Sequence, residues 1–335
     1  MADVMTRTDT ISLIEASRLA LTHALEDDPA VVLLGEDIAD AQGGGIIKVT
    51  EGLSTRFGSD RVRSTPIAEQ AIAGAAIGAA MSGLRPVAEI MMMNFITVAM
   101  DQLVNHAAKL RYMSGGRTGV PLTIRTIAGG GAQLGAQHSD TFEAWLAHVP
   151  GLKVVVPSTT TDAYGLLLSC IFDDDPCVFI ETTLLYYGGG TGPAPERGQR
   201  VPIGKAAVVR PGRDLTIVGY GQTVPESLAA AERLAADGID AEVVDLRTVS
   251  PLDRETLASS AARTRRVLVV HEAPGPFGVG AEVASIIHEE VHSDLLAPVR
   301  RLGSRPSPVP YAANLEALYR PGPASIEAAA RQLAG

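Results

Sequence analysis

The stretch of sequence that decides the fold is residues 65–90, TPIAEQAIAGAAIGAAMSGLRPVAEI. Residues 66–83 are rich in alanine and larger apolar side chains, which predicts a helix. Residues 86–90 form a short apolar run, which predicts a strand. A helix that leads directly into a buried strand is the repeating unit of an α/β protein.

The same alternation extends to both sides of this stretch. Upstream, a helix is expected over 11–27 and a strand over 31–34. Downstream, the first half is expected to continue with a helix at 95–114, strands at 120–127 and 153–156, a helix at 160–172 and a strand at 177–181. This order predicts a doubly wound, mostly parallel sheet with helices on both faces.

A Gly/Pro-rich segment separates the two halves of the chain. Residues 188–198, GGGTGPAPERG, carry almost no apolar side chains, which is typical of a linker. The alternation then restarts, with strands expected at 214–219, 240–245, 266–270 and 298–302 and helices at 223–237, 253–262, 279–292 and 324–333. The 335 residues are therefore predicted to form two α/β domains, 1–187 and 204–335, joined by a linker at 188–203.

The composition narrows the class of protein. Hydrophobic residues make up 46% of the chain, enough for packed cores, and the formal net charge of −10 argues against nucleic acid or an anionic membrane as partner. No apolar run reaches the roughly 18 residues of a membrane span. The N-terminus resembles neither a signal peptide nor an import presequence, so a cytoplasmic location is expected. Cys170 and Cys177 form no CxxC motif and are expected to be small core residues.

Residues 288–292, HEEVH, match the HExxH zinc motif on a predicted helix. In a metalloprotease this spacing places two imidazoles on one helical face, with the glutamate as base. No third ligand is evident nearby, and five-residue matches arise by chance. We therefore interpret the segment as the polar end of an amphipathic helix.

Glu69 is the candidate for chemistry in the opening stretch. Thr65 is expected to cap the helix and Pro66 to occupy its first position, which places Glu69 one turn in, ahead of almost entirely apolar or small residues. A carboxylate there is either solvated at the helix edge or buried for a purpose. If it is buried, it must be paired, protonated or bound to a ligand that donates a hydrogen bond.

Residues 65–90, together with 94–116 (NFITVAMDQLVNHAAKLRYMSGG) and 135–159 (GAQHSDTFEAWLAHVPGLKVVVPST), resemble the β subunit of thiamine-diphosphate-dependent 2-oxo acid dehydrogenases. This family serves pyruvate, branched-chain 2-oxo acid and acetoin dehydrogenase complexes. Residues 243–253 (VVDLRTVSPLD) and 269–285 (VVHEAPGPFGVGAEVAS) are similar to its transketolase-like C-terminal domain. The resemblance covers nearly the whole chain, in order, and implies a pyrimidine-binding domain followed by that C-terminal domain.

The resemblance implies a role for each of several residues. The carboxylate of Glu69 would bond N1′ of the aminopyrimidine and promote the imino tautomer, whose nitrogen can take the thiazolium proton. Phe95 would stack on the pyrimidine, although a core role is equally compatible with the sequence alone. Glu36, after strand 31–34, would join a polar network near the cofactor, and Met91 would contribute to the wall beside the pyrimidine.

His138 lies on a loop between a glycine-rich turn and a helix expected at 140–147. Many loop histidines are merely exposed, but one here can reach a cleft and titrate near neutrality. In the resembled family this histidine assists acyl transfer to a lipoyl group or binds the substrate carboxylate.

The resemblance also implies partners and ions. The chain lacks the GDG segment that usually holds Mg²⁺, so an α subunit of an α₂β₂ heterotetramer would supply Mg²⁺ and the diphosphate half of the thiamine diphosphate site. The acyl group would pass to a lipoyl acyltransferase (E2) core. Family members often hold a structural K⁺, mostly through backbone oxygens, and the matching positions are Leu122, Cys170, Asp173 and Asp175. A solvated acidic turn explains the last two equally well.

The expected activity is that of an E1 oxidoreductase, EC 1.2.4.-, acting on a small 2-oxo acid such as pyruvate with a lipoyl disulfide as acceptor. Three alternatives remain open. The chain could serve acetoin, it could be a carboligase or transketolase-like half-enzyme without a lipoyl partner, or it could be a non-catalytic assembly subunit.

Overall fold

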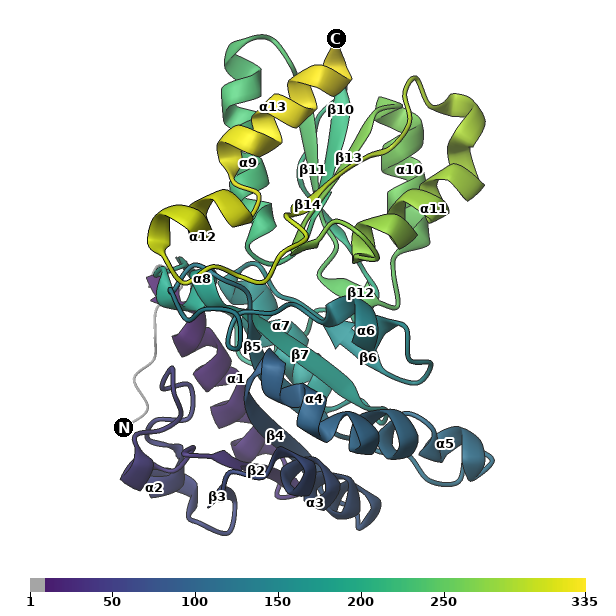
Figure 1. The fold of residues 1–335 in the computed structure, drawn as a ribbon. Coiled ribbons are helices and arrows are strands. Elements are labelled where there is room, and N and C mark those ends of the chain that lie inside the picture. Colours follow the sequence, from purple (N-terminus) through teal and green to yellow (C-terminus); the bar gives the residue numbers. More distant parts are fainter. Residues whose placement is uncertain (1–9) are drawn as a thin grey trace. The chain divides into compact units, whose positions relative to one another are not determined.

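The computed structural model describes residues 10–335, which fold into two compact units (Figure 1). The first unit comprises the described residues up to Ala128 together with Trp145–Ile203. The second comprises Gly129–Ala144 and Gly204–Gly335, so the chain crosses between the units three times. One crossing falls within the short helix α6 (Glu143–Ala147).

The first unit is built on a parallel sheet, as the sequence predicts. Its strands are β2 (Val31–Glu36), β3 (Val62–Thr65), β4 (Arg85–Met92), β5 (Thr123–Ala128), β6 (Lys153–Val155) and β7 (Cys177–Thr182). They run in the order β6-β7-β5-β4-β2-β3, and the pairs are parallel. Every residue of β5 and β7 is buried, because helices cover both faces of the sheet.

Helices α1 and α7 pack together on the sheet, as do α3 and α4 (Figure 1). The helices of this unit are α1 (Leu13–Asp27), α2 (Leu53–Phe57), α3 (Glu69–Met81), α4 (Met93–Asp101), α5 (Leu110–Met113), α7 (Thr160–Ile171) and α8 (Thr183–Tyr187), with a 3₁₀ turn η1 (Asp40–Gln42). Ser12 and Glu15 form a capping box that begins α1, and Thr159 caps α7. Cys170 and Cys177 are buried and free, as expected.

The prediction for the start of the 66–83 helix is wrong. The helix α3 begins at Glu69, and its N-cap is Ala68. Thr65 instead ends β3, where it pairs with Glu36 of β2, and its hydroxyl donates to the carbonyl of Pro66. Because strand pairing claims Thr65, Glu69 occupies the first position of the helix rather than a place one turn in.

The helix expected at 95–114 is also not continuous. α4 is followed by a π-helical segment, η2 (Gln102–Ala107), and then by the single turn α5. The amide of Ala108 donates to Leu103, five residues back, which is the wider spacing of a π-helix.

Part of the glycine-rich segment packs on the first unit. β8 (Thr191–Pro193) pairs antiparallel with β1 (Thr10–Ser12). Farther along, Arg197 forms ion pairs with Glu26 and Asp27 of α1. This segment is therefore tied down along much of its length.

The second unit has a sheet in the order β14-β13-β10-β11-β9. The pairs among β10 (Leu215–Gly219), β11 (Ala241–Asp245), β13 (Val267–Pro274) and β14 (Arg300–Ser304) are parallel, and the edge strand β9 (Ala207–Arg210) is antiparallel. A further short strand is β12 (Thr248–Ser250).

Helices flank this second sheet on both sides (Figure 1). α9 (Thr223–Ala236) and α13 (Pro323–Ala334) pack together over a core that includes Leu215, Val243 and Ile326. α10 (Arg254–Thr264) and α11 (Val279–Val291) pack together as a second pair. The unit is completed by the 3₁₀ turn η3 (His292–Asp294) and by α12 (Ala313–Tyr319), a helix that the sequence pattern did not predict.

Within residues 10–335, no helix combines the length and hydropathy needed to cross a membrane.

Candidate active site

The predicted cofactor residues of the first unit gather where three neighbouring strands end. β3, β2 and β4 are adjacent and parallel, so their carboxyl ends lie at the same edge of the sheet. Glu36 is the last residue of β2, and Glu69 begins the helix that follows β3. Met91 lies near the end of β4, and Phe95 lies in the first turn of α4, directly after it.

Glu36 and Glu69 are close enough to influence each other. Burial raises the pKa of Glu36 above its ordinary value, and the negative charges of Asp37 and Glu69 raise it further. Both glutamates are half-buried. Glu69 also lies at the N-terminal end of α3, where the helix dipole favours a negative charge. The arrangement therefore offers one acid with a raised pKa beside a second carboxylate at a helix terminus.

Met91 and Phe95, the two apolar residues predicted for the site, are half-buried. Met92 and Met93 are only 1% and 0% exposed. Of the three consecutive methionines, Met91 is therefore the one that can contribute to a wall beside a ligand.

A buried ion network that the sequence analysis missed lies within the same strands. Arg125 of β5 donates to both carboxylate oxygens of Glu181 at 2.7 Å and to Glu89 at 2.6 Å. Arg125 and Glu181 are each 1% exposed. Burial alone would lower the pKa of Arg125, but the charges of Glu181 and Glu89 raise it above its ordinary value. The available signal was a charged residue inside each of three apolar strands.

Two glycines, one in β2 and one in the loop that follows it, lie close to Glu89 of this network. A Cβ added to Gly35 would lie 2.9 Å from Glu89, and one added to Gly45 would lie 3.1 Å from a Glu89 carboxylate oxygen. Gly45 also has a φ of +82°, which L side chains rarely adopt. The glycine loop at 43–45 therefore lies close against Glu89.

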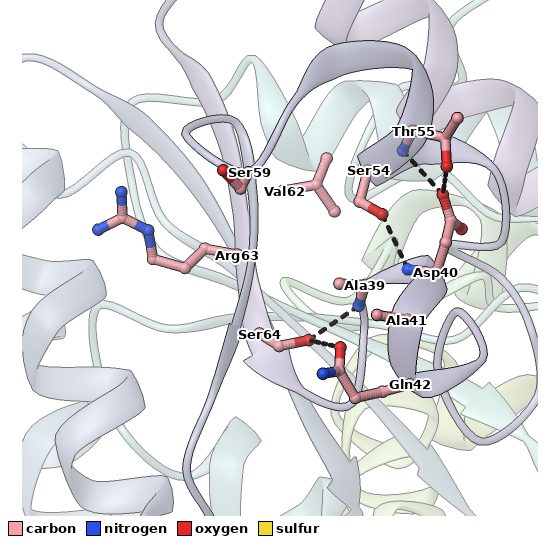
Figure 2. Close-up of a pocket in the computed structure, with 10 residues that line it drawn as sticks. All are labelled: Ala39, Asp40, Ala41, Gln42, Ser54, Thr55, Ser59, Val62, Arg63 and Ser64. Atoms are coloured by element: carbon pink, nitrogen blue, oxygen red, sulfur yellow. Dashed lines mark hydrogen bonds between the residues drawn. The ribbon is translucent and has the colours of Figure 1, made fainter.

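A polar hollow of about 520 Å³ adjoins the loop that follows β2 (Figure 2). Burial alone would raise the pKa of Asp40, but hydrogen bonds from the Thr55 hydroxyl and from the amides of Gly52 and Thr55 lower it to about 2. The Ser54 and Ser64 hydroxyls accept from the amides of Asp40 and Ala39. These bonds fix the chain directly after Glu36.

His138 lies on a loop of the second unit. Residues 129–142, named here the His138 loop, contain no helix or strand, and the imidazole is half-buried. The helix expected at 140–147 is shorter and begins at Glu143. Glu69 and His138 thus belong to different compact units.

The four candidate K⁺ residues meet in one region of the first unit. The carbonyl of Leu122 accepts from the amide of Cys177, and the carbonyl of Cys170 accepts from the amide of Asp173. Each carbonyl has two lone pairs, so the bond to Leu122 leaves room for an ion, whereas the Cys170 carbonyl also accepts from the amide of Phe172. The carboxylates, however, are engaged, since Asp173 binds Lys153 and Asp175 binds Arg111.

The segment 288–292 has the surroundings of a solvated helix end. His288 Nδ1 lies 2.7 Å from the carbonyl oxygen of Ala284, and Arg254 binds Glu289 and Glu290. Among the residues that the structure describes, no group of three His, Cys, Asp or Glu side chains could hold a metal ion.

Comparisons with known proteins match both units. Residues 9–188 match the transketolase pyrimidine-binding domain family, and residues 204–326 match the transketolase C-terminal domain family. Among solved structures, a split-gene transketolase described as an inactive β4 tetramer is similar, with a TM-score of 0.79 at 24% identity over 97% of this chain and 98% of that one. A transketolase from Leishmania mexicana has a TM-score of 0.69 at 18% identity over 99% of this chain and 47% of that one. These structures support the fold.

Three similar sequences are β subunits of oxidoreductases. The chain is 45% identical to the 2-oxoisovalerate dehydrogenase β subunit of Bacillus subtilis, covering 97% of this chain and 98% of the relative. It is 43% identical to the β subunit of acetoin:2,6-dichlorophenolindophenol oxidoreductase of Cupriavidus necator, covering 94% and 96%. It is 44% identical to a mitochondrial pyruvate dehydrogenase E1 β subunit of Oryza sativa subsp. japonica, covering 95% and 85%.

Proposed function

The chain belongs to the family of E1 β subunits of 2-oxo acid dehydrogenases, and we propose that it acts with an α subunit to decarboxylate a 2-oxo acid such as pyruvate. Its two domains are of the transketolase pyrimidine-binding and C-terminal types. The acyl group then passes to a lipoyl carrier, which makes the assembly an oxidoreductase of the EC 1.2.4.- type. Thiamine diphosphate, when bound, supplies the electron sink for this decarboxylation.

The observation that carries the proposal is the position of Glu69 beside Glu36 at the carboxyl ends of adjacent parallel strands. This chain's residues fit an aminopyrimidine. Glu69 can accept a hydrogen bond from a protonated ring nitrogen, while Phe95 and Met91 offer half-buried apolar surface for the ring. Glu36, whose pKa is raised by burial, can hold a proton beside Glu69.

The diphosphate half of the cofactor and Mg²⁺ belong, in this proposal, to the α subunit of an α₂β₂ heterotetramer. The absence of a GDG segment from the sequence supports this division, as do the names of the relatives as β subunits. His138 assists acyl transfer or binds the substrate carboxylate. K⁺ at the turn around Asp173, an E2 core as acceptor and a cytoplasmic location stay predictions.

A second candidate is the β component of an acetoin dehydrogenase. The relative from Cupriavidus necator, which is named for acetoin, is 43% identical, about as similar as the relatives named for 2-oxo acids. The two candidates share the cofactor and differ in the carbon–carbon bond that is cleaved.

The test is an assay of the chain co-expressed with its α partner, using pyruvate, branched-chain 2-oxo acids and acetoin as substrates and a dye as electron acceptor. We expect turnover of one substrate class, and loss of at least about a hundredfold in Glu69→Gln, since a positioned acid–base group contributes roughly 10²–10⁴-fold. Asp60→Asn is the matched control, because the Asp60 side chain is 98% exposed. A fully active Glu69→Gln assembly would overturn the proposal.

A further inference from the structure

The His138 loop is attached to the second unit through two carboxylates. The amide of Gly130 donates to Glu272 Oε1 at 2.7 Å, and the amide of Gly131 donates to Glu316 Oε1 at 2.7 Å. The amide of Gln133 also reaches Glu316, at 3.2 Å from Oε2. Three backbone donors within four residues are thus bound by acidic side chains from β13 and α12.

Both acids are buried, since Glu272 is 9% and Glu316 is 4% exposed. A buried carboxylate is costly unless hydrogen-bond donors or cations compensate it. The positive charge of Arg320 acts on Glu272, but Arg320 forms its ion pair with Glu226, and Glu226 and Glu143 add negative charge. The amides of the loop therefore provide compensation that the surrounding side chains supply only in part.

The glycine run at 129–131 is explained by this attachment. Gly129 has a φ of +94°, and a Cβ there would lie 2.8 Å from a carboxylate oxygen of Glu272. A Cβ at Gly130 would lie 3.2 Å from Glu316 Oε1. Larger residues would hold the backbone away from the carboxylates, so the glycines permit the close approach.

His138 lies between two further contacts of the chain with the rest of the second unit. On its N-terminal side, Gly135 packs against the ring of Tyr311, with an added Cβ only 3.2 Å from that ring. On its C-terminal side, buried Glu143 accepts a hydrogen bond of 2.7 Å from the Tyr220 hydroxyl. The loop is thereby fixed within the second unit on both sides of the histidine.

We propose that Glu272 and Glu316 are positioning residues, which hold the His138 loop in one conformation and so determine where the His138 imidazole stands during the reaction. This inference rests on the proposed function for the importance of His138. The attachment of the loop can be tested without that function.

The first test is hydrogen exchange across residues 129–142 in the chain assembled with its α partner. In Glu316→Ala, the amides of the His138 loop should exchange about tenfold faster or more, because a hydrogen bond to a charged group contributes roughly 1.5–3 kcal/mol. Glu316→Gln keeps an acceptor oxygen, so the amides of its His138 loop should exchange at nearly the same rate as in the unchanged protein. Glu289→Ala is the control, since the Glu289 side chain is 61% exposed in the same unit.

The second test is a double-mutant cycle on kcat with His138→Ala. If Glu316 acts through the histidine, Glu316→Ala should lower kcat in the unchanged background and have no further effect when His138 is already alanine. A purely structural role would lower kcat equally in both backgrounds, and that result would overturn the inference. Unchanged exchange in Glu316→Ala, or equal damage from Glu316→Gln, would also overturn it.

The two tests separate the two proposals. If His138→Ala is fully active, the proposed role of His138 fails, and with it the claim that the loop positions a reacting group. Faster loop exchange in Glu316→Ala would still establish the attachment.

Discussion

Arg125 binds two buried carboxylates, those of Glu89 and Glu181, with one guanidinium. Burial raises the pKa of Glu181, and the Arg125 charge opposes that rise. Such a network contributes little net stability compared with an apolar core, but removal of one partner leaves uncompensated charge.

Arg125→Met is therefore expected to destabilise the chain by about 3–5 kcal/mol. Urea denaturation would measure the change in the free energy of unfolding. Arg63→Met serves as control, since the Arg63 side chain is 65% exposed in its pair with Asp60 and its loss should cost at most about 1 kcal/mol. Equal effects of the two substitutions would contradict the buried-network interpretation.

Glu272 makes the stability of the second unit depend on pH. Burial raises the pKa of Glu272 from its ordinary value of 4.5 to about 7, while the Gly130 amide opposes the rise. Between these two pH values the folded state binds more protons than the unfolded state. The contribution of Glu272 to the free energy of unfolding is therefore fully present below pH 4.5. It falls by about 3 kcal/mol in total as the pH rises to about 7.

In Glu272→Gln this decline should be absent, because the amide does not titrate and still accepts from Gly130. Thermal unfolding at pH 5 and pH 8 would compare the variant with the unchanged chain, with Glu289→Gln as control. A pH dependence that is the same in Glu272→Gln would show that other groups cause it. The buried acids Glu143 and Glu226 also have pKa values raised by burial, so part of the slope should remain.

Among the helices and strands, α3 shows which features of an element the sequence pattern can predict. Its existence and its following strand were predictable, because thirteen consecutive residues lack proline and are mostly apolar or small. The start of α3 was not predictable, because a threonine such as Thr65 suits both a helix cap and a strand. In the structure, Thr65 pairs with β2 and therefore belongs to a strand. The attachment of the His138 loop was equally hidden, since it joins residues 142 and more positions apart in sequence.

The two glycines of α3 have different surroundings. A Cβ on Gly74 would make a van der Waals contact with Gln102 of the same chain, at 3.4 Å. A Cβ on Gly78 would meet nothing within 4 Å, and Gly78 is exposed together with Ala71, Ala75 and Met81. An apolar helix with an exposed small-residue face is suited to contact another chain.

We expect Gly78→Ala to stabilise the isolated chain by about 1 kcal/mol, through helix propensity, and to weaken its assembly with the α partner. Chemical denaturation would measure the first effect and sedimentation of the mixed subunits the second. Gly74→Ala is the matched control in the same helix, because its added methyl group would contact Gln102 within the chain and should leave assembly unchanged. Unimpaired assembly of Gly78→Ala would exclude this face from the subunit interface.

For the whole molecule, the proposed division of the cofactor between two polypeptides has a direct consequence. The described residues place two acids, an aromatic ring and a methionine at one sheet edge, which suits a pyrimidine ring. The sequence carries no GDG segment for the metal-bound diphosphate. The isolated chain should therefore bind thiamine diphosphate with Mg²⁺ poorly and turn over no substrate.

Titration with purified α subunit should restore activity, with saturation at one α subunit per chain, because each site needs one half from each polypeptide. Steady-state turnover and calorimetric binding of thiamine diphosphate would be followed along the same titration. They should rise together, since an assembled site is required for both. Turnover by the isolated chain, or saturation far below equal amounts of the two subunits, would contradict a site shared between them.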